Sequence, residues 1–205
     1  MTDGTLEPGG CLVCDSSKSA SIWTLVSTSQ SKVFTFEAAS DDWTYDNSDP
    51  ALGWQRHNKR AANGSYSLYY GNPTTGTYDN GVVNSGTATS PAIALSADKK
   101  AGAYFMVYLD IEVGNSIMDA LKLQVIVGTN ASTVWEKDVG QQPYLRQWIP
   151  IAVDLSAYAG STIQLRFDFN TSDKVSNLGE GVYIDDFTIY YDCTSPTAPT
   201  TDAGI

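Results

Sequence analysis

Four segments of the chain alternate regularly between apolar and polar residues. The longest is AYFMVYLDIEV (103–113), and the others are ALKLQVIVG (120–128), QWIPIAVDLS (147–156) and STIQLRFDFN (161–170). Because successive side chains of a β-strand point to opposite faces, each segment would bury one face and expose the other. This pattern is typical of antiparallel sheets, and no segment of the sequence shows sustained helical periodicity.

Shorter strand candidates complete the pattern: KVFTFE (32–37), SYSLYYG (65–71), TATSPAIAL (87–95) and STVWEKD (132–138). Turn residues separate them, and LSAYAG (155–160) is expected to form a single turn. A total of about nine or ten strands requires two sheets packed face to face. The sequence therefore predicts an all-β fold, a two-sheet antiparallel β-sandwich of jelly-roll type.

The two ends of the chain differ in composition from its middle. Residues 1–30 form a polar extension with one strand candidate, SIWTLV (21–26), and residues 194–205 form a Pro/Thr-rich linker. We assign residues 31–193 to the sandwich. The chain starts without the basic and apolar regions of a signal peptide, and no stretch approaches the roughly 20 apolar residues of a membrane span. We therefore expect a domain of a longer chain, with neighbouring domains as partners.

Acidic residues outnumber basic residues by 23 to 12, which gives a formal net charge of −11. Such a charge repels the phosphate backbone of nucleic acid and an anionic lipid surface, so neither is an expected partner. Only 17% of the residues are charged, whereas small polar residues and tyrosine are plentiful. This composition favours an extracellular or cell-surface location.

Three cysteines form an odd set, with Cys11 and Cys14 in CLVC and Cys193 at the far end of the chain. A structural zinc site is disfavoured because there is no second CxxC pair and the single histidine, His57, is distant in sequence. A thioredoxin-like redox role is disfavoured because no helical pattern follows the pair. We expect one of the CLVC cysteines to form a disulfide with Cys193, and the sequence leaves open which one.

The closing segment GEGVYIDDFTIYYDC (179–193) places two aspartates in the middle of an apolar strand. Val182 and Ile184 have one parity along this strand, whereas Phe187 and Ile189 have the other. One extra residue at the aspartate pair, a β-bulge, would return all four apolar side chains to the same face. Bulges re-aim side chains and often lie near functional sites.

A series of motifs spans residues 33–192 in a recognisable order and spacing. The motifs are FTFE (34–37), DDWTYDNSDPALGWQR (41–56), GSYSLYYGN (64–72), TATSPAIALS (87–96), WIPIAVDLSAYAGSTIQLRFDF (148–169) and GEGVYIDDFTIY (179–190). Together they resemble the bacterial jelly-roll domains related to MAM domains, which occur after secreted metallopeptidases of the immune-inhibitor-A type and in multidomain, anchor-associated surface proteins. The chain departs from that pattern at the Val182-Tyr183 pair and in lacking the MAM cysteines. The resemblance implies a non-catalytic module that often carries a structural Ca²⁺.

The carboxylates can be weighed as ligands of such an ion. Glu37 ends the candidate strand KVFTFE, and a jelly roll commonly brings its first and last strands together, which would place Glu37 near Asp185 and Asp186. Converging carboxylates repel one another unless a cation neutralises them, and Ca²⁺ takes about six to eight oxygen ligands. We expect Asp186 to be the better ligand of the pair, with Asp185 next. Further candidate oxygens belong to Asp42, Asp79 and Asn80. The alternative is that one aspartate caps the bulge backbone and the other is solvated.

Recognisable catalytic motifs are absent from the sequence. Adjacent aspartates on a regular strand point in different directions, unlike the facing carboxyl pair of a glycosidase. Neither a GxSxG elbow nor an HExxH motif is present, and the sequence contains one histidine. We therefore expect a module that is not an enzyme.

Aromatic residues crowd positions 43–78, and such residues can stack on sugar rings. If the strands at 103–113 and 161–170 adjoin, their polar faces would form one aromatic-edged surface. The candidate ligand-binding residues are Tyr70, Tyr104, Tyr108, Arg166 and Asp168. The sequence leaves three functions open: a carbohydrate-binding module, a protein-adhesion module, and a structural accessory domain of a secreted metallopeptidase.

Overall fold

The computed structural model describes residues 30–39, 42–112, 118–137 and 145–193, together with the backbone of two short strands near the N-terminus. These two strands, β1 (Leu12–Cys14) and β2 (Trp23–Leu25), pair with each other in antiparallel fashion. The sequence predicted only the second of them.

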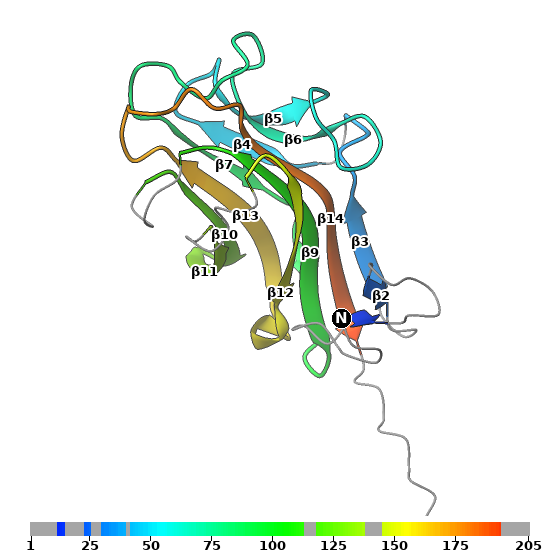
Figure 1. Ribbon diagram of the computed structural model, residues 1–205. Coiled ribbons are helices and arrows are strands. Elements are labelled where there is room, and N and C mark those ends of the chain that lie inside the picture. The colour runs from blue at the N-terminus through cyan, green and yellow to red at the C-terminus, as the bar shows by residue number, and fades with distance from the viewer. Residues whose placement is uncertain are drawn as a thin grey trace, which may run out of the picture.

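Two six-stranded antiparallel sheets make up the rest of the described chain (Figure 1). The first sheet has the order β11-β10-β13-β7-β4, with β8 also pairing with β13. Its strands are β4 (Thr44–Asn47), β7 (Ser85–Thr89), β8 (Ile93–Ala94), β10 (Ala120–Val127), β11 (Asn130–Glu136) and β13 (Thr162–Asn170). We call it the β10–β13 sheet.

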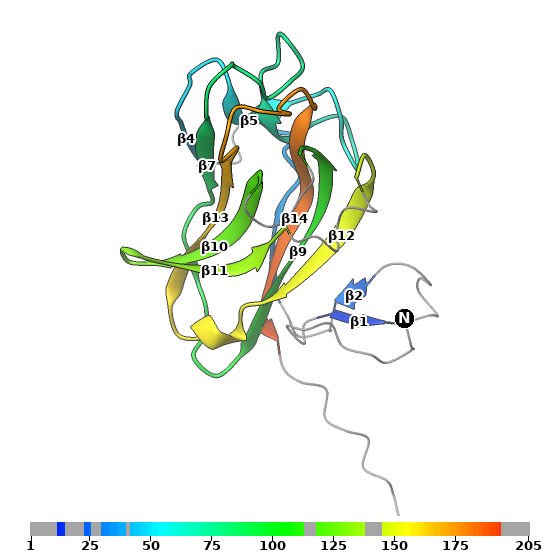
Figure 2. The same cartoon turned by 60° about the vertical axis from the view of Figure 1, so that its left-hand side comes forward.

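The second sheet has the order β12-β9-β14-β6-β5, with β3 also pairing with β14. Its strands are β3 (Gln30–Phe34), β5 (Gly53–His57), β6 (Ser67–Gly71), β9 (Lys100–Asp110), β12 (Trp148–Asp154) and β14 (Gly181–Cys193). We call it the β9–β14 sheet. Figure 2 shows the two sheets as separate layers, with β10 and β13 in one and β9, β12 and β14 in the other.

The core lies between the two layers and is built from the apolar parity of each strand. In β13, for example, buried residues alternate with partly exposed ones along the whole strand. Phe167 from this strand packs edge-on against Phe105 of β9 and Phe187 of β14, with ring centroids 5.2 and 5.5 Å apart. Removing such rings from water is the main stabilising contribution to this fold. The structure thus confirms the predicted two-sheet antiparallel β-sandwich.

The predicted β-bulge is present in β14. Asp185 pairs with Met106 of β9 and Thr188 pairs with Tyr104, so three residue steps on β14 oppose two on β9. Asp186 takes the extra position with a positive φ of 49°, a conformation that Asp tolerates better than most residues. As a result, the apolar residues on both sides of the bulge are all fully buried in the same core: Val182, Ile184, Phe187 and Ile189.

Two strands of the sandwich, β4 and β5, were not predicted. Both are short and lack a clean alternation, because β4 is mostly exposed and β5 is buried or partly buried throughout. The predicted segment 87–95 is divided into β7 and β8 around Pro91, which has no N–H for the ladder. The turn predicted at LSAYAG is the single 3-10 turn Ser156–Tyr158.

Cys193, the last residue of β14, is disulfide-bonded. The predicted partners, Cys11 and Cys14, have side chains that lie outside the described part of the structure, so the predicted pairing stays a prediction. Among the described residues, no helix is long and apolar enough to cross a membrane.

Candidate functional site

The strands that carry the predicted ligand-binding residues belong to different sheets. β9, with Tyr104 and Tyr108, pairs with β12 and β14, whereas β13, with Arg166 and Asp168, pairs with β10, β7 and β8. All four side chains have the parity that faces away from the core. The predicted surface that joins them is therefore wrong, because the two pairs lie on opposite outer faces of the sandwich.

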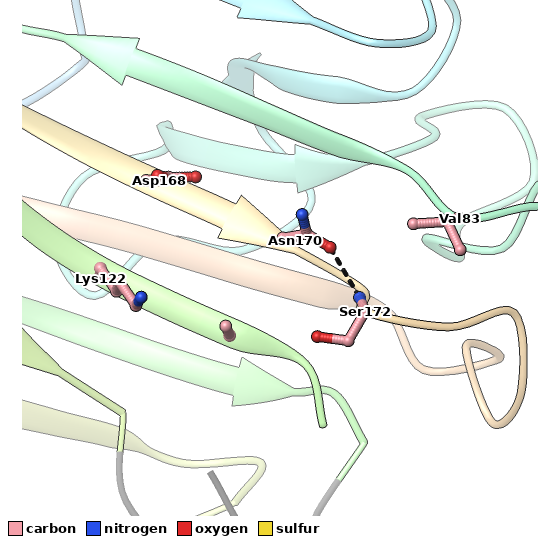
Figure 3. Close-up of a pocket in the computed structure, with 6 residues that line it drawn as sticks. Val83, Lys122, Asp168, Asn170 and Ser172 are labelled. Atoms are coloured by element: carbon pink, nitrogen blue, oxygen red, sulfur yellow. Dashed lines mark hydrogen bonds between the residues drawn. The ribbon is translucent and has the colours of Figure 1, made fainter. Parts of the chain in front are cut away.

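The outer face of the β10–β13 sheet carries a groove with a volume of about 440 Å³ (Figure 3). Asp168 and Asn170 of β13 and Lys122 of β10 line it together with residues of the adjoining loops. The full lining described by the structure is Val83, Ala120, Lys122, Asp168, Asn170 and Ser172. An ammonium, a carboxylate and an amide thus share one open cavity that lies at the end of two paired strands.

The register of the strands explains why these side chains meet. Lys122 is the direct antiparallel partner of Asp168, and Asp168 is also opposite Thr87 of β7. Directly opposed residues lie about 4.5–5.5 Å apart at their Cβ atoms and project from the same face. Asn170 Oδ1 accepts a hydrogen bond from the Ser172 N–H at 2.7 Å, which fixes the amide at the rim of the groove (Figure 3).

Polar side chains continue from the groove along the same face. The next rung of the sheet aligns Gln124, Arg166 and Thr89, and Arg166 Nε donates to Gln124 Oε1 at 2.9 Å. Donors and acceptors therefore alternate over neighbouring strands, an arrangement that suits a ligand rich in hydroxyl groups. Lys122 was not among the predicted site residues, although its parity in ALKLQVIVG marked it as outward-facing; only the strand pairing reveals its place beside Asp168.

The aromatic residues on the outer face of the opposite sheet are largely covered. Tyr69 and Tyr183 are fully buried and stack with centroids 4.5 Å apart, and Tyr108, which is 6% exposed, packs edge-on against Tyr183. Arg60 lies over the Tyr108 ring at 4.5 Å and donates to both carboxylate oxygens of Glu180 at 2.7 and 2.9 Å. This bidentate ion pair lowers the pKa of Glu180. Tyr108 is consequently part of a structural cluster.

The remaining two tyrosines among the candidates, Tyr70 and Tyr104, differ from each other in exposure. Tyr70 is fully buried in the core, where its hydroxyl donates to Asn84 Oδ1 at 2.7 Å and its ring packs against Trp54 and Phe169. It was expected at the surface, but β6 is buried on both faces, so alternation does not apply there. Tyr104 remains half-buried on the outer face of β9.

Asp185 uses its carboxylate to hold the loop that follows β5. Its Oδ2 accepts the N–H groups of Ala62 and Asn63 at 2.7 and 3.1 Å, and its Oδ1 accepts the N–H of Asp186 at 2.7 Å. Burial nevertheless raises the pKa of Asp185 to about 6. Three backbone donors already occupy this carboxylate, so it matches the alternative in which one aspartate of the pair caps backbone at the bulge.

Asp186 and Glu37 are brought near each other by the pairing of β3 with β14. Their proximity shows in the pKa of Asp186, which is raised by partial burial and by the negative charge of Glu37. Glu37 Oε1 accepts the N–H groups of Ser65 and Tyr66 at 2.9 and 2.8 Å, and these bonds lower the pKa of Glu37. Within the described part of the chain, Asp186 accepts no hydrogen bond at its carboxylate. The two carboxylates therefore repel each other, and the charge of Arg56 acts on Glu37.

The other predicted metal ligands make local turns. Asp79 Oδ1 accepts the N–H of Gly81 at 2.8 Å, and Asn80 bonds to Asp49 and Asn84. Asp42 lines a small crevice of about 100 Å³ beside Arg56. Across the described ranges, no three His, Cys, Asp or Glu side chains are grouped as metal ligands. An ion bound by Glu37 and Asp186 would therefore need further oxygen ligands from groups other than Asp and Glu side chains.

Comparison with known proteins shows which solved structures have a similar fold. No family model and no curated protein matches the chain, so the resemblance to MAM-related domains stays a prediction. The K1 cleaved adhesin domain of Lys-gingipain from Porphyromonas gingivalis has a similar structure, with a TM-score of 0.57, 15% sequence identity and coverage of 80% of this chain and 99% of that chain. The K3 adhesin domain of the same protein has a TM-score of 0.53 at 12% identity, over 77% and 97%. TmCBM61, solved in complex with β-1,4-galactotriose, has a TM-score of 0.50 at 16% identity, over 77% and 94%.

Proposed function

We propose that this protein is a non-catalytic binding module of a secreted or cell-surface protein, and that it binds carbohydrate in the groove on the β10–β13 sheet. The observation that carries this proposal is the groove itself, which places Lys122, Asp168 and Asn170 around about 440 Å³ of open volume. Hydroxyl groups of a sugar can donate to the carboxylate and accept from the ammonium at the same time. The fold shared with a module that was solved with a galactotriose supports the same class of ligand.

A test of this proposal compares both outer faces of the sandwich. Retention on a panel of soluble polysaccharides that includes β-1,4-galactan is measured by affinity electrophoresis. We expect Asp168→Ala and Lys122→Ala to abolish retention on the polysaccharide that binds the wild type, without a change in melting temperature. Asp98→Asn is the matched control, because Asp98 is exposed and pairs only with Lys99 among the described contacts.

The outcome separates the two faces. If Tyr104→Ala abolishes binding while Asp168→Ala does not, the ligand sits on the β9–β14 sheet and the groove is the wrong site. If no polysaccharide is retained, the carbohydrate proposal fails as a whole.

One observation favours a protein ligand as the second candidate. Two loops beside the groove expose large apolar side chains, and the loops are joined by hydrogen bonds between Asn84 and Thr171. The exposed residues are Val82, Val83, Val175 and Leu178. Exposed apolar residues gathered at one end are a common mark of a protein contact, and the similar adhesin domains suit this function. Charged replacements at Val82 and Leu178, which do not line the groove, would select this alternative if they abolish binding to a surface protein but not to polysaccharide. The same exposed side chains could instead contact a neighbouring metallopeptidase domain in an accessory role.

We also propose that Glu37 and Asp186 hold a structural Ca²⁺. The support is the proximity of the two carboxylates, since Glu37 Oε2 and both oxygens of Asp186 accept no hydrogen bond from the described residues, although the charge of Arg56 acts on Glu37. Both groups are hard oxygen donors of the kind that Ca²⁺ prefers. The ion would neutralise their repulsion and join the end of β3 to the bulge of β14.

Calcium binding at this pair predicts a stability difference. An ion at about 100 times its Kd would stabilise the fold by about 2.7 kcal/mol. Thermal unfolding should therefore shift upward between EDTA and millimolar CaCl₂ in the wild type and in Asp98→Asn, and the shift should be smaller in Asp186→Asn. An identical midpoint with and without calcium in the wild type would contradict the proposal.

A further inference from the structure

A buried polar cluster surrounds the hydroxyl of Tyr78. The hydroxyl lies 2.6 Å from Asp119 Oδ2 and 3.4 Å from the Ser176 carbonyl oxygen, and it accepts the Glu112 N–H at 2.8 Å. Asp119 Oδ2 accepts the same Glu112 N–H at 2.8 Å. The end of β9, the start of β10 and the loop before β14 therefore meet at one point.

Three oxygen atoms in the segments that meet here have no hydrogen-bond partner. They are Asp119 Oδ1, Glu112 Oε2 and Asn177 Oδ1, and each atom is buried. Asp119 is fully buried, and Asn177, the residue after Ser176, is 1% exposed. The Asn177 amide nitrogen donates to the Asp173 carbonyl at 3.1 Å, which fixes the orientation of the side chain. Because buried polar atoms are almost always paired, three orphan oxygens in adjoining segments need an explanation.

Lys137 is the basic residue beside the cluster, but in the described structure its ammonium group forms no ion pair within 4.0 Å with the carboxylate of Asp119 or Glu112. Lys137 Nζ instead donates to the Glu112 carbonyl at 3.2 Å. Burial raises the pKa of Asp119 to about 6, although the bonds from Tyr78 and the Glu112 N–H and the charge of Lys137 oppose this effect. The charge of Glu112 adds to it. Burial also lowers the pKa of Lys137. The cluster thus carries two acidic groups and one partly buried ammonium that contacts neither.

We propose that Asp119, Glu112 and Asn177 form a second cation site, with Ca²⁺ as the ligand and the Ser176 carbonyl as a further oxygen donor. All the orphan atoms are oxygens, two of them from carboxylates, which is the donor set of a hard divalent ion rather than of zinc. A bound ion would join the ends of β9 and β10 to the loop before β14. This inference depends neither on the carbohydrate proposal nor on an ion at Glu37 and Asp186.

Terbium luminescence can test the site, because Tyr78 lies beside it and tyrosine excitation sensitises a bound Tb³⁺. The full chain is first treated with a chelator, then titrated with TbCl₃ and finally with CaCl₂ as competitor. We expect a sensitised signal that calcium displaces. The signal should persist in Asp186→Asn, which removes the other proposed site, and should be lost when Asp119→Asn is added to Asp186→Asn.

Glu112→Gln is the second variant, since Glu112 is only partly buried and its change is less disruptive to folding. We expect it to weaken Tb³⁺ and Ca²⁺ binding on the order of tenfold, because one ligand charge is lost. Lys137→Gln should strengthen binding by removing a nearby positive charge. The proposal is overturned if Glu112→Gln and Lys137→Gln leave the affinity unchanged, or if the sensitised signal disappears in Asp186→Asn while Glu112→Gln retains it.

Discussion

Asp185 provides the sharpest test of how the β14 bulge organises the structure. Its carboxylate accepts three backbone N–H groups, two from the loop after β5 and one from Asp186. An alanine at this position removes all three acceptors. An asparagine can keep its oxygen toward Ala62 and Asn63, but its amide then faces the Asp186 N–H, so at least one donor loses its partner.

The cost of each change follows from the number of donors left unpaired. Each buried donor without a partner costs about 1–3 kcal/mol. At about 2 kcal/mol for each donor, Asp185→Ala, which leaves three unpaired, is expected to cost about 6 kcal/mol, and Asp185→Asn, which leaves one, about 2 kcal/mol. For a chain of this length, each kcal/mol lowers the melting temperature by about 2–4 °C. The expected decreases are therefore about 12–24 °C for Asp185→Ala and about 4–8 °C for Asp185→Asn.

Differential scanning calorimetry in EDTA measures these decreases without a contribution from bound calcium, and hydrogen exchange adds a local readout. In Asp185→Asn we expect faster exchange of the Asp186 amide, and in Asp185→Ala faster exchange at Ala62 and Asn63 as well. The exposed control Asp98→Asn should change stability by no more than about 0.5 kcal/mol. Equal melting temperatures for wild type and Asp185→Ala, with unchanged exchange at Ala62, would refute the role assigned to this carboxylate.

Three further predictions follow from buried contacts. Trp54→Phe should lower the free energy of unfolding in urea by about 1–3 kcal/mol. The reason is that Trp54 Nε1 donates to the Gly86 carbonyl at 2.9 Å and so joins β5 of one sheet to β7 of the other. An unchanged unfolding midpoint would show that this bond contributes nothing. Gly181→Ala should lower the free energy of unfolding by about 1–3 kcal/mol in the same assay, since φ is +110° and a Cβ would lie 2.1 Å from the Tyr70 carbonyl oxygen. An unfolding midpoint equal to that of the wild type would contradict this expected strain. For Asp119, the folded-state pKa of about 6 lies above its ordinary value of 3.8, so the folded state binds the proton more tightly. In EDTA, the stability of wild type relative to Asp119→Asn should therefore fall as pH rises from about 4 to about 6, by on the order of 2–3 kcal/mol. A difference that stays constant over that range would contradict the raised pKa.

Local patterns in the sequence predicted the strands and the direction of their side chains. Alternation has a period of two along the backbone, so it can be read wherever one face of a strand is buried and the other is wet, as in β10 and β13. The bulge at Asp185 and Asp186 was predictable for the same reason, because the parity of the apolar residues changes at that point. Where a strand is buried on both faces, as in β6, alternation carries no information, and Tyr70 was placed wrongly at the surface.

The sequence by itself determined the β-sandwich, the outward parity of Arg166 and Asp168, and the bulge in β14. Only the tertiary structure decided which strands are neighbours, because pairing is a contact between segments far apart in the chain and leaves no local pattern. In the folded protein, Lys122 lies beside Asp168, whereas Tyr104 and Tyr108 lie on the other outer face of the sandwich. The unpaired oxygens of Asp119 and Asn177 are buried. Burial of a polar atom depends on the loops that close over it, so a candidate ion site of this kind becomes visible only once the fold has brought those loops together.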